Sequence, residues 1–257
     1  MAFLKYISDD DLISEVKKVL DVVINRKKQA PEKFHENVID PFSTLFEAAI
    51  FDIKHSGWRR TETIRQCQKT LTSKIGKFHQ NILGHVTGWV NLKTGSESGV
   101  DLQCKNKKLI AEVKNKHNTI TGGKLVNEYI ALEELIMPKA SKFVGYTAYF
   151  VTIVPSKPSG IDEPFTPSNK KTGVRCVSNK NIRIIDGASF YALVTGRENA
   201  LGELYKALPK VIERIYRTDY KKTGYNLPDK AEFSEYFKFA YIKKKKVAKK
   251  KVAKKIT

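Results

Sequence analysis

Cysteine is scarce in this sequence, where Cys67, Cys104 and Cys176 are the three among 257 residues. Their odd number and wide spacing exclude a disulfide framework and a zinc finger, and they are typical of a protein from a reducing compartment. The sequence also lacks long apolar runs, and its first residues lack the charged and apolar regions of a signal peptide. We therefore expect a soluble cytoplasmic protein without a membrane partner.

Acidic residues are few relative to basic ones: 27 Asp and Glu stand against 47 Lys and Arg, for a net charge of +20. Nine of the lysines lie between residues 243 and 255, which leaves a net charge of +11 for the rest of the chain. A basic body with a basic tail favours a polyanionic partner, most commonly nucleic acid. Charge alone leaves open a solubilising or ribosome-associated surface.

The apolar content is enough for a folded core, since hydrophobic residues make up 41% of the chain and include 13 Phe and 11 Tyr. The length fits one large domain, which we place at residues 1–241. The lysine repeat at residues 242–257 is expected to be an unstructured tail.

Hydrophobic periodicity predicts the order of the elements. Helical spacing predicts helices at residues 11–28, 37–54 and 58–83, the first of them capped by Asp9–Asp11. The second has an apolar stripe that indicates a core helix, formed by Phe42, Leu45, Phe46, Ala49, Ile50 and Ile53. Beyond residue 99 the period changes to two, which predicts strands at 99–104, 108–114, 146–154 and 181–185, with helices at 123–137 and 197–217 and a long loop at 156–173. The order predicts an α/β fold: an αβα core with a mixed central sheet and an N-terminal helical layer.

The segment SGVDLQCKNKKLIAEVKNK, residues 98–116, carries the predicted chemistry. It reads as a β-hairpin, and a two-residue turn at Asn106–Lys107 makes residues whose numbers sum to 213 face each other. Asp101 then lies opposite Glu112, and Lys114 lies one step along the same face. Two carboxylates at this distance repel each other unless a positive group lies between them.

A divalent cation between these carboxylates removes the conflict. Mg²⁺ prefers oxygen ligands and keeps several waters, so that Asp101, Glu112 and a backbone carbonyl such as that of Val113 suffice to hold it. The cation activates water and neutralises charge on a phosphate under attack. Lys114 would orient the water or stabilise the added negative charge. The competing interpretation is an ordinary surface hairpin, because the spacing is short and degenerate.

The spacing Asp101-x₁₀-Glu112-x-Lys114 resembles the PD-(D/E)xK motif of restriction endonucleases, with Val100 at the variable position of the nominal proline. The segments RRTETIRQCQKT, IAEVKNKHNT and FYALVTG, within residues 10–215, resemble one group of small type II restriction enzymes, some of which cut GGNCC-type sites. The resemblance implies a restriction-endonuclease-like αβα core, Mg²⁺ and a homodimer on palindromic double-stranded DNA. It also implies a prokaryotic host with a cognate methyltransferase.

Further polar residues are candidates for the same function. Glu47 is a candidate metal ligand, since the resemblance implies a helix carboxylate near the cation; a solvated or helix-pairing glutamate is the default interpretation. Two groups of side chains are candidates for binding phosphates or base edges: Arg59, Arg60, Arg65, Gln66 and Lys69 on the third helix, and Asn115, Lys116, Asn118 and Thr119 after the second hairpin strand. A solvated helix face is the alternative for the first group.

Two other functions stay open from the sequence. A structure-specific nuclease, such as a junction resolvase, would use the same fold and motif. A non-enzymatic nucleic-acid-binding protein would carry Asp101 and Glu112 incidentally. Digestion of a plasmid in Mg²⁺ separates the three, because discrete fragments, cutting at junctions alone and no cutting are different results.

Overall fold

The computed structural model describes residues 2–92, 99–120, 122–158, 160–169 and 171–242. Apart from Ile242, the tail predicted at residues 242–257 lies outside the described residues. Within the described part, no helix is long and apolar enough to cross a membrane. Its three cysteines are free, as their number and spacing predict.

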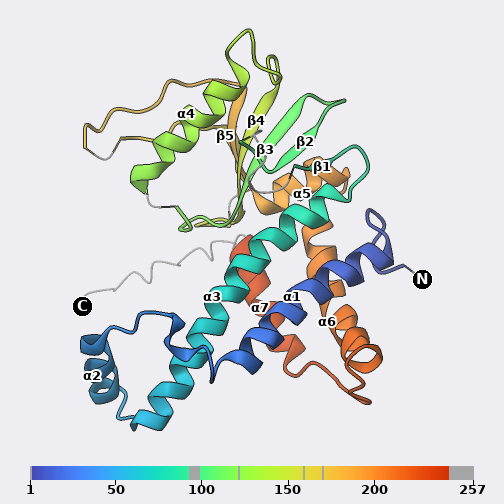
Figure 1. Ribbon diagram of the computed structural model, residues 1–257. Coiled ribbons are helices and arrows are strands. Elements are labelled where there is room, and N and C mark those ends of the chain that lie inside the picture. The colour runs from blue at the N-terminus through green and yellow to red at the C-terminus, as the bar shows by residue number, and fades with distance from the viewer. Residues whose placement is uncertain (1, 93–98, 121, 159, 170, 243–257) are drawn as a thin grey trace, which may run out of the picture.

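A six-stranded mixed sheet is the centre of the fold, in the order β1-β2-β3-β4-β6-β5 (Figure 1). The strands are β1 Val90–Asn91, β2 Leu102–Cys104, β3 Leu109–Lys116, β4 Thr147–Val154, β5 Asp162–Pro164 and β6 Ile182–Asp186. The inner strands β3, β4 and β6 run parallel, and the outer pairs are antiparallel. Strand β4 is buried along most of its length, as expected for a parallel strand covered on both faces.

Helices cover both faces of the sheet. The α-helices are α1 Asp9–Gln29, α2 Pro41–Ile50, α3 His55–Gly84, α4 Leu125–Ile136, α5 Gly187–Thr195, α6 Ala200–Thr218 and α7 Lys230–Tyr241, with short 3₁₀ helices at Phe34–Glu36 and Gly122–Lys124. Helix α4 packs on one face through Tyr129, Leu132 and Ile136. Residues of α1, α3, α5 and α6 form the larger core on the other face. The predicted αβα core with a mixed sheet and an N-terminal helical layer is therefore confirmed.

Several local predictions need correction. Ser8, rather than the three aspartates, caps α1: its hydroxyl accepts a hydrogen bond from the backbone N–H of Asp11, and the aspartates occupy the first turn. The loop predicted at residues 156–173 contains the short edge strand β5, because Asp162–Pro164 pairs with β6. Helix α7 was not predicted, since its aromatic residues precede the lysine repeat without a clear apolar stripe.

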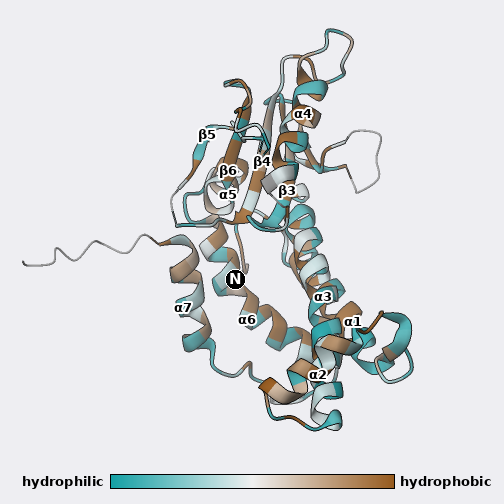
Figure 2. Ribbon diagram, turned by 90° about the vertical axis from the view of Figure 1, so that its left-hand side faces the viewer, coloured by the Kyte–Doolittle hydropathy of each residue, from teal (hydrophilic) through white to brown (hydrophobic). Residues whose placement is uncertain are grey.

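The prediction that the second helix belongs to the core is wrong. Every residue of α2 is described, and none of them is buried. Phe42, Leu45, Phe46 and Ile50 expose between 69% and 75% of their surface. Figure 2 places α2 at the end of the molecule opposite the sheet, beyond the reach of either core. An apolar stripe predicts that a helix buries one face, but it does not say against what.

Candidate active site

The hairpin of β2 and β3 has the register that the sequence predicts. Leu102 pairs with Ala111, so Asp101 lies opposite Glu112, and the Asp101 backbone N–H donates to the Ala111 carbonyl oxygen at 3.0 Å. The turn, however, is a four-residue loop, residues 105–108, in which Lys108 has a left-handed backbone with φ of 52°. This loop is centred on Asn106–Lys107, as the expected turn was, so opposed residues still sum to 213 and each side chain points to the predicted face.

Asp101 and Glu112 form a carboxylate pair in which Asp101 is buried and Glu112 is partly buried. Asp101 is 8% exposed and accepts a hydrogen bond from the backbone N–H of Val113 at 2.8 Å. Burial raises the pKa of Asp101, although the Val113 N–H opposes the shift. Burial also raises the pKa of Glu112, and the neighbouring Asp101 charge adds to it. The pair is thus electrostatically unfavourable in its charged form, which is the property of a cation site.

Lys114 is the ammonium group that faces this pair. Its Nζ lies 2.5 Å from a carboxylate oxygen of Glu112. Burial alone would lower the pKa of Lys114, but the hydrogen bond to Glu112 and the nearby carboxylates outweigh it and raise the pKa. Lys114 therefore stays protonated at neutral pH and acts as a fixed positive charge.

Two side chains that the sequence did not single out complete the site. Glu128 of α4 places a carboxylate oxygen 3.8 Å from Nζ of Lys114. Gln80 of α3 directs its amide toward Val113, with Nε2 at 3.4 Å from the carbonyl oxygen, and it also hydrogen bonds to Asp101. Both residues lie far from the hairpin in the sequence, so the spacing within the hairpin motif could not identify either of them.

The chemistry of the ligands fits a hard divalent cation. Within the described part of the chain, no three His, Cys, Asp or Glu side chains converge as metal ligands. A pair of carboxylates is nevertheless what Mg²⁺ requires from a protein, since it fills its other positions with a carbonyl oxygen and water. Burial raises the pKa values of Asp101 and Glu112, and a cation bound between the two carboxylates would favour their charged forms.

Glu47 belongs to α2, which lies beside the end of α3 that is farther from the sheet (Figure 1). Its carboxylate accepts hydrogen bonds from the indole Nε1 of Trp58 at 3.0 Å and from the guanidinium of Arg65 at 3.0 and 3.3 Å. These contacts hold α2 on α3. The structure thus does not bring Glu47 together with Asp101 and Glu112.

The cationic group of α3 lies on the N-terminal half of that helix. Arg59 stacks on the Phe34 ring at 4.7 Å, and Arg65 is paired with Glu47 and Glu62. Arg60 and Lys69 are exposed. Gln66 is different from the rest, because it is 6% exposed and its amide donates to Glu62 and to the backbone of Phe34. Its placement is that of a side chain that supports the helix packing.

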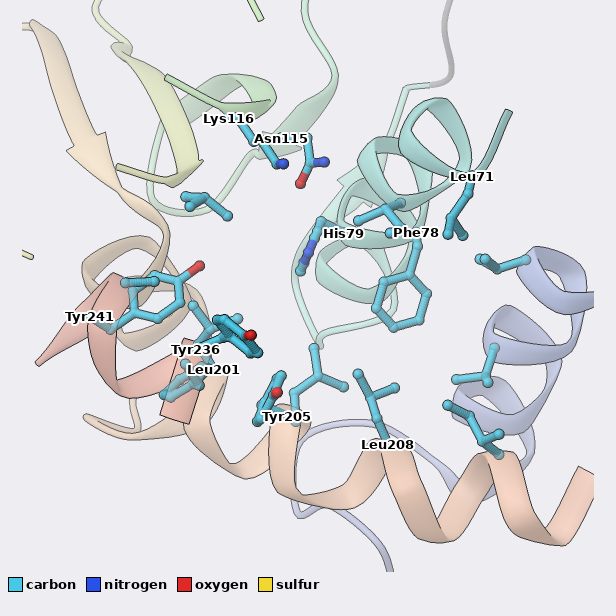
Figure 3. A pocket seen from close by; sticks show the side chains of 18 of the residues that line it. Leu71, Phe78, His79, Asn115, Lys116, Leu201, Tyr205, Leu208, Tyr236 and Tyr241 are labelled. Carbon is cyan, nitrogen blue, oxygen red and sulfur yellow. The ribbon is translucent and has the colours of Figure 1, made fainter. Parts of the chain in front are cut away.

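The residues after Lys114 separate into two environments. Asn115 and Lys116 lie on one side of an apolar cavity of about 520 Å³ between α1, α3, α6 and α7, where Figure 3 shows them near His79. Burial lowers the pKa of His79 to about 4, so this histidine is neutral at physiological pH. Asn118 and Thr119 are exposed in the turn that follows β3. Exposure there leaves them accessible to a ligand of the active site.

Comparison with known proteins identifies relatives over most of the chain. Residues 4–217 match a family described as Eco47II restriction endonuclease. A protein named type II restriction enzyme Eco47II, from Escherichia coli, is 52% identical over 94% of this chain and 100% of its own length. Another, type II restriction enzyme Sau96I from Staphylococcus aureus, is 29% identical over 88% of this chain and 85% of its own. Both names agree with the resemblance that the hairpin motif indicates.

Proposed function

We propose, on the premise that this chain belongs to the Eco47II restriction endonuclease family, that its type II endonuclease reaction takes place at the β2–β3 hairpin. Asp101, Glu112 and Lys114 are the catalytic residues of this proposal, and double-stranded DNA with a short specific site is the substrate. The observation that carries it is the pair formed by the buried Asp101 and the partly buried Glu112, with one protonated lysine beside it. A surface hairpin of incidental charges would not bury Asp101.

Asp101, Glu112 and the Val113 carbonyl oxygen are the proposed ligands of Mg²⁺. When bound, the cation supplies Lewis-acid stabilisation of the charge that develops on the phosphate. Gln80 holds both Asp101 and the Val113 carbonyl from the side of α3, which fixes the direction of two of the three ligands. Glu47 is not part of this set, because its carboxylate is engaged by Trp58 and Arg65.

Lys114 acts on the reacting phosphate as a fixed positive charge. Its ammonium group donates a hydrogen bond to Glu112. A Glu112 carboxylate committed to a cation attracts that ammonium less, and Glu128 at 3.8 Å is then the carboxylate that keeps it directed into the site. Its protonated state suits it to stabilise added negative charge and makes it a poor general base.

The substrate contacts that we propose are on the side of the hairpin and along α3. Asn118 and Thr119 are exposed directly after the catalytic strand, and Arg60 and Lys69 are exposed on α3. The cations of Arg60 and Lys69 and the polar groups of Asn118 and Thr119 are suited to binding phosphate oxygens, which positions DNA without reading its bases. We further propose that the enzyme acts as a homodimer, since the two halves of a palindromic DNA site present the same contacts to two identical subunits.

The metal requirement provides the first test. We expect plasmid DNA to be cut into discrete fragments in Mg²⁺ or Mn²⁺, and to remain uncut in excess chelator. Ca²⁺ should support binding without efficient cleavage, because it is larger and less demanding of geometry. The measurement is gel analysis of the digest beside a binding titration in each ion. Full activity in chelator would contradict the cation site, and cutting of junctions alone would indicate a structure-specific nuclease.

The role of Glu128 provides a second test. We expect Glu128→Gln to lower the rate of cleavage about 10- to 100-fold, the usual cost of losing a group that orients a catalytic residue. Single-turnover kinetics on a short duplex with one site measure the rate, and a Mg²⁺ titration shows whether affinity for the ion changes as well. Glu134→Gln, on the exposed side of the same helix, is the matched control. Equal cleavage rates for the two variants would contradict the role of Glu128 in orienting Lys114.

A further inference from the structure

The apolar surface of α2 is the largest feature that the proposed function leaves unexplained. It consists of residues from α2 and both of its flanks, which we call the α2 surface: Val38, Phe42, Leu45, Phe46, Ile50 and Phe51. Each of these side chains is at least 67% exposed. Four of them follow helical spacing within α2, so they form one continuous stripe instead of scattered exposed positions.

The α2 surface is held in a fixed orientation. Asp40 caps the helix by accepting from the backbone N–H groups of Phe42 and Ser43, and Glu47 ties it to α3 through Trp58 and Arg65. The Asp40 contacts fix the N-terminus of α2, and the Glu47 contacts join α2 to α3. The apolar stripe is therefore presented to the outside by a braced helix, which is the arrangement of a preorganised interface.

The size of the α2 surface fits the centre of a protein interface. An aromatic side chain offers roughly 200 Å², so three phenylalanines exposed by about 70% present about 400 Å². The three aliphatic side chains add to this area. Soluble monomers rarely expose an apolar patch larger than a few hundred Å², whereas a stable interface takes about 800 Å² from each partner, with an apolar centre and a polar rim.

The lack of positive charge on the α2 surface distinguishes between nucleic acid and protein as its partner. The sequence of α2 contains no lysine or arginine, and its one acidic residue, Glu47, is neutralised by Arg65. Nucleic acid is excluded as the occupant because it would need cations on this stripe. The rest of the protein is strongly basic, so a neutral apolar stripe is where two copies meet with the least repulsion.

We infer that the α2 surface is the interface with a second copy of this chain. A contact between identical patches across a two-fold axis needs no complementary shape elsewhere, and antiparallel α2 helices would oppose their dipoles favourably. A second copy is also what the proposed function, on which this assignment rests, calls for. Because α2 and the sheet lie at opposite ends of the molecule in both views, the interface leaves the active site open (Figures 1 and 2).

The experiment compares the full-length protein with single charge substitutions. Phe46→Glu brings two charges into the centre of the two-fold contact and is expected to weaken dimerisation at least about 100-fold, as loss of a central hot spot does. Sedimentation velocity over a concentration series measures the effect, and thermal unfolding of each variant shows that the fold survives. Val174→Glu, at a valine that is 66% exposed outside the α2 surface, is the matched control and should leave the dimer intact.

Cleavage assays on the same samples separate this inference from the proposed function. A wild-type dimer that Phe46→Glu converts to monomer supports the interface, whether or not the protein cuts DNA. A wild-type protein that cuts plasmid but sediments as a monomer, or a dimer that Phe46→Glu leaves intact, overturns the interface and leaves the nuclease assignment standing. Monomeric protein that binds vesicles of zwitterionic phospholipid through Phe46 would also overturn it, because the occupant would then be a lipid surface.

Discussion

Replacement of Glu112 by glutamine is expected to lower the rate of DNA cleavage by a factor on the order of 10³ or more, comparable with removal of a preorganised charge from an active site. Glutamine keeps the size of the side chain but cannot hold the cation between itself and Asp101. Lys114→Ala is expected to have a similar effect, since it removes the ammonium beside the reacting phosphate. Single-turnover cleavage in Mg²⁺ measures both rates.

Binding and stability should respond to Glu112→Gln differently from cleavage. Specific DNA binding in Ca²⁺ is expected to survive, because the contacts with phosphates and bases lie on other residues. The melting temperature should not fall, since the raised pKa of Glu112 means that the fold disfavours its charged form at neutral pH and glutamine removes that cost. A variant that cuts at the wild-type rate contradicts the assignment of the site. A variant that fails to fold contradicts the conclusion that the charged form of Glu112 costs stability.

Replacement of Gly187 by alanine is expected to destabilise the fold by about 3 kcal/mol or more, the upper end of the cost of overpacking. A methyl group at Gly187 would lie 2.3 Å from the carbonyl oxygen of Ile153 and 2.7 Å from its Cα atom. These are backbone atoms of β4, so no side chain can turn away to make room. Helix α5 would have to leave the sheet or β4 would have to bend.

Thermal unfolding measures this effect, with an expected fall in melting temperature of about 6–12 °C for a chain of this size. Gly123→Ala is the control, because no heavy atom of the described residues lies within 4 Å of a methyl group there. It should change the free energy of unfolding by less than about 0.5 kcal/mol. Equal melting temperatures for the two variants would show that α5 does not pack on β4 at the distance observed.

The hairpin and its register could be predicted from the sequence because both depend on local spacing. Alternation along residues 108–114 determines which side chains share a face, and the length of the turn determines which residues lie opposite each other. Asp101, Glu112 and Lys114 are close together for these reasons alone. The strands stop pairing one residue earlier on each side of the turn than expected, and the site is unaffected because the register itself is the predicted one.

The contacts between distant elements could not be predicted in this way. The sequence favoured Glu47 as the additional carboxylate, whereas the structure engages Glu47 with Trp58 and Arg65 and brings Glu128 to Lys114. Both residues are glutamates on helices, and nothing in their neighbouring residues separates them. What separates them is the crossover that carries α4 back across the sheet beside β3.

The sequence by itself determined most of the helices and strands, the hairpin chemistry and the preference for a polyanion, since periodicity, turn length and net charge are properties of the chain alone. The tertiary structure decided which surfaces those elements bury. It buried Gln66 within the helical layer and left the apolar stripe of α2 exposed, although their residue types suggested the reverse. A side chain is buried only where another element covers it, and that depends on how distant segments pack.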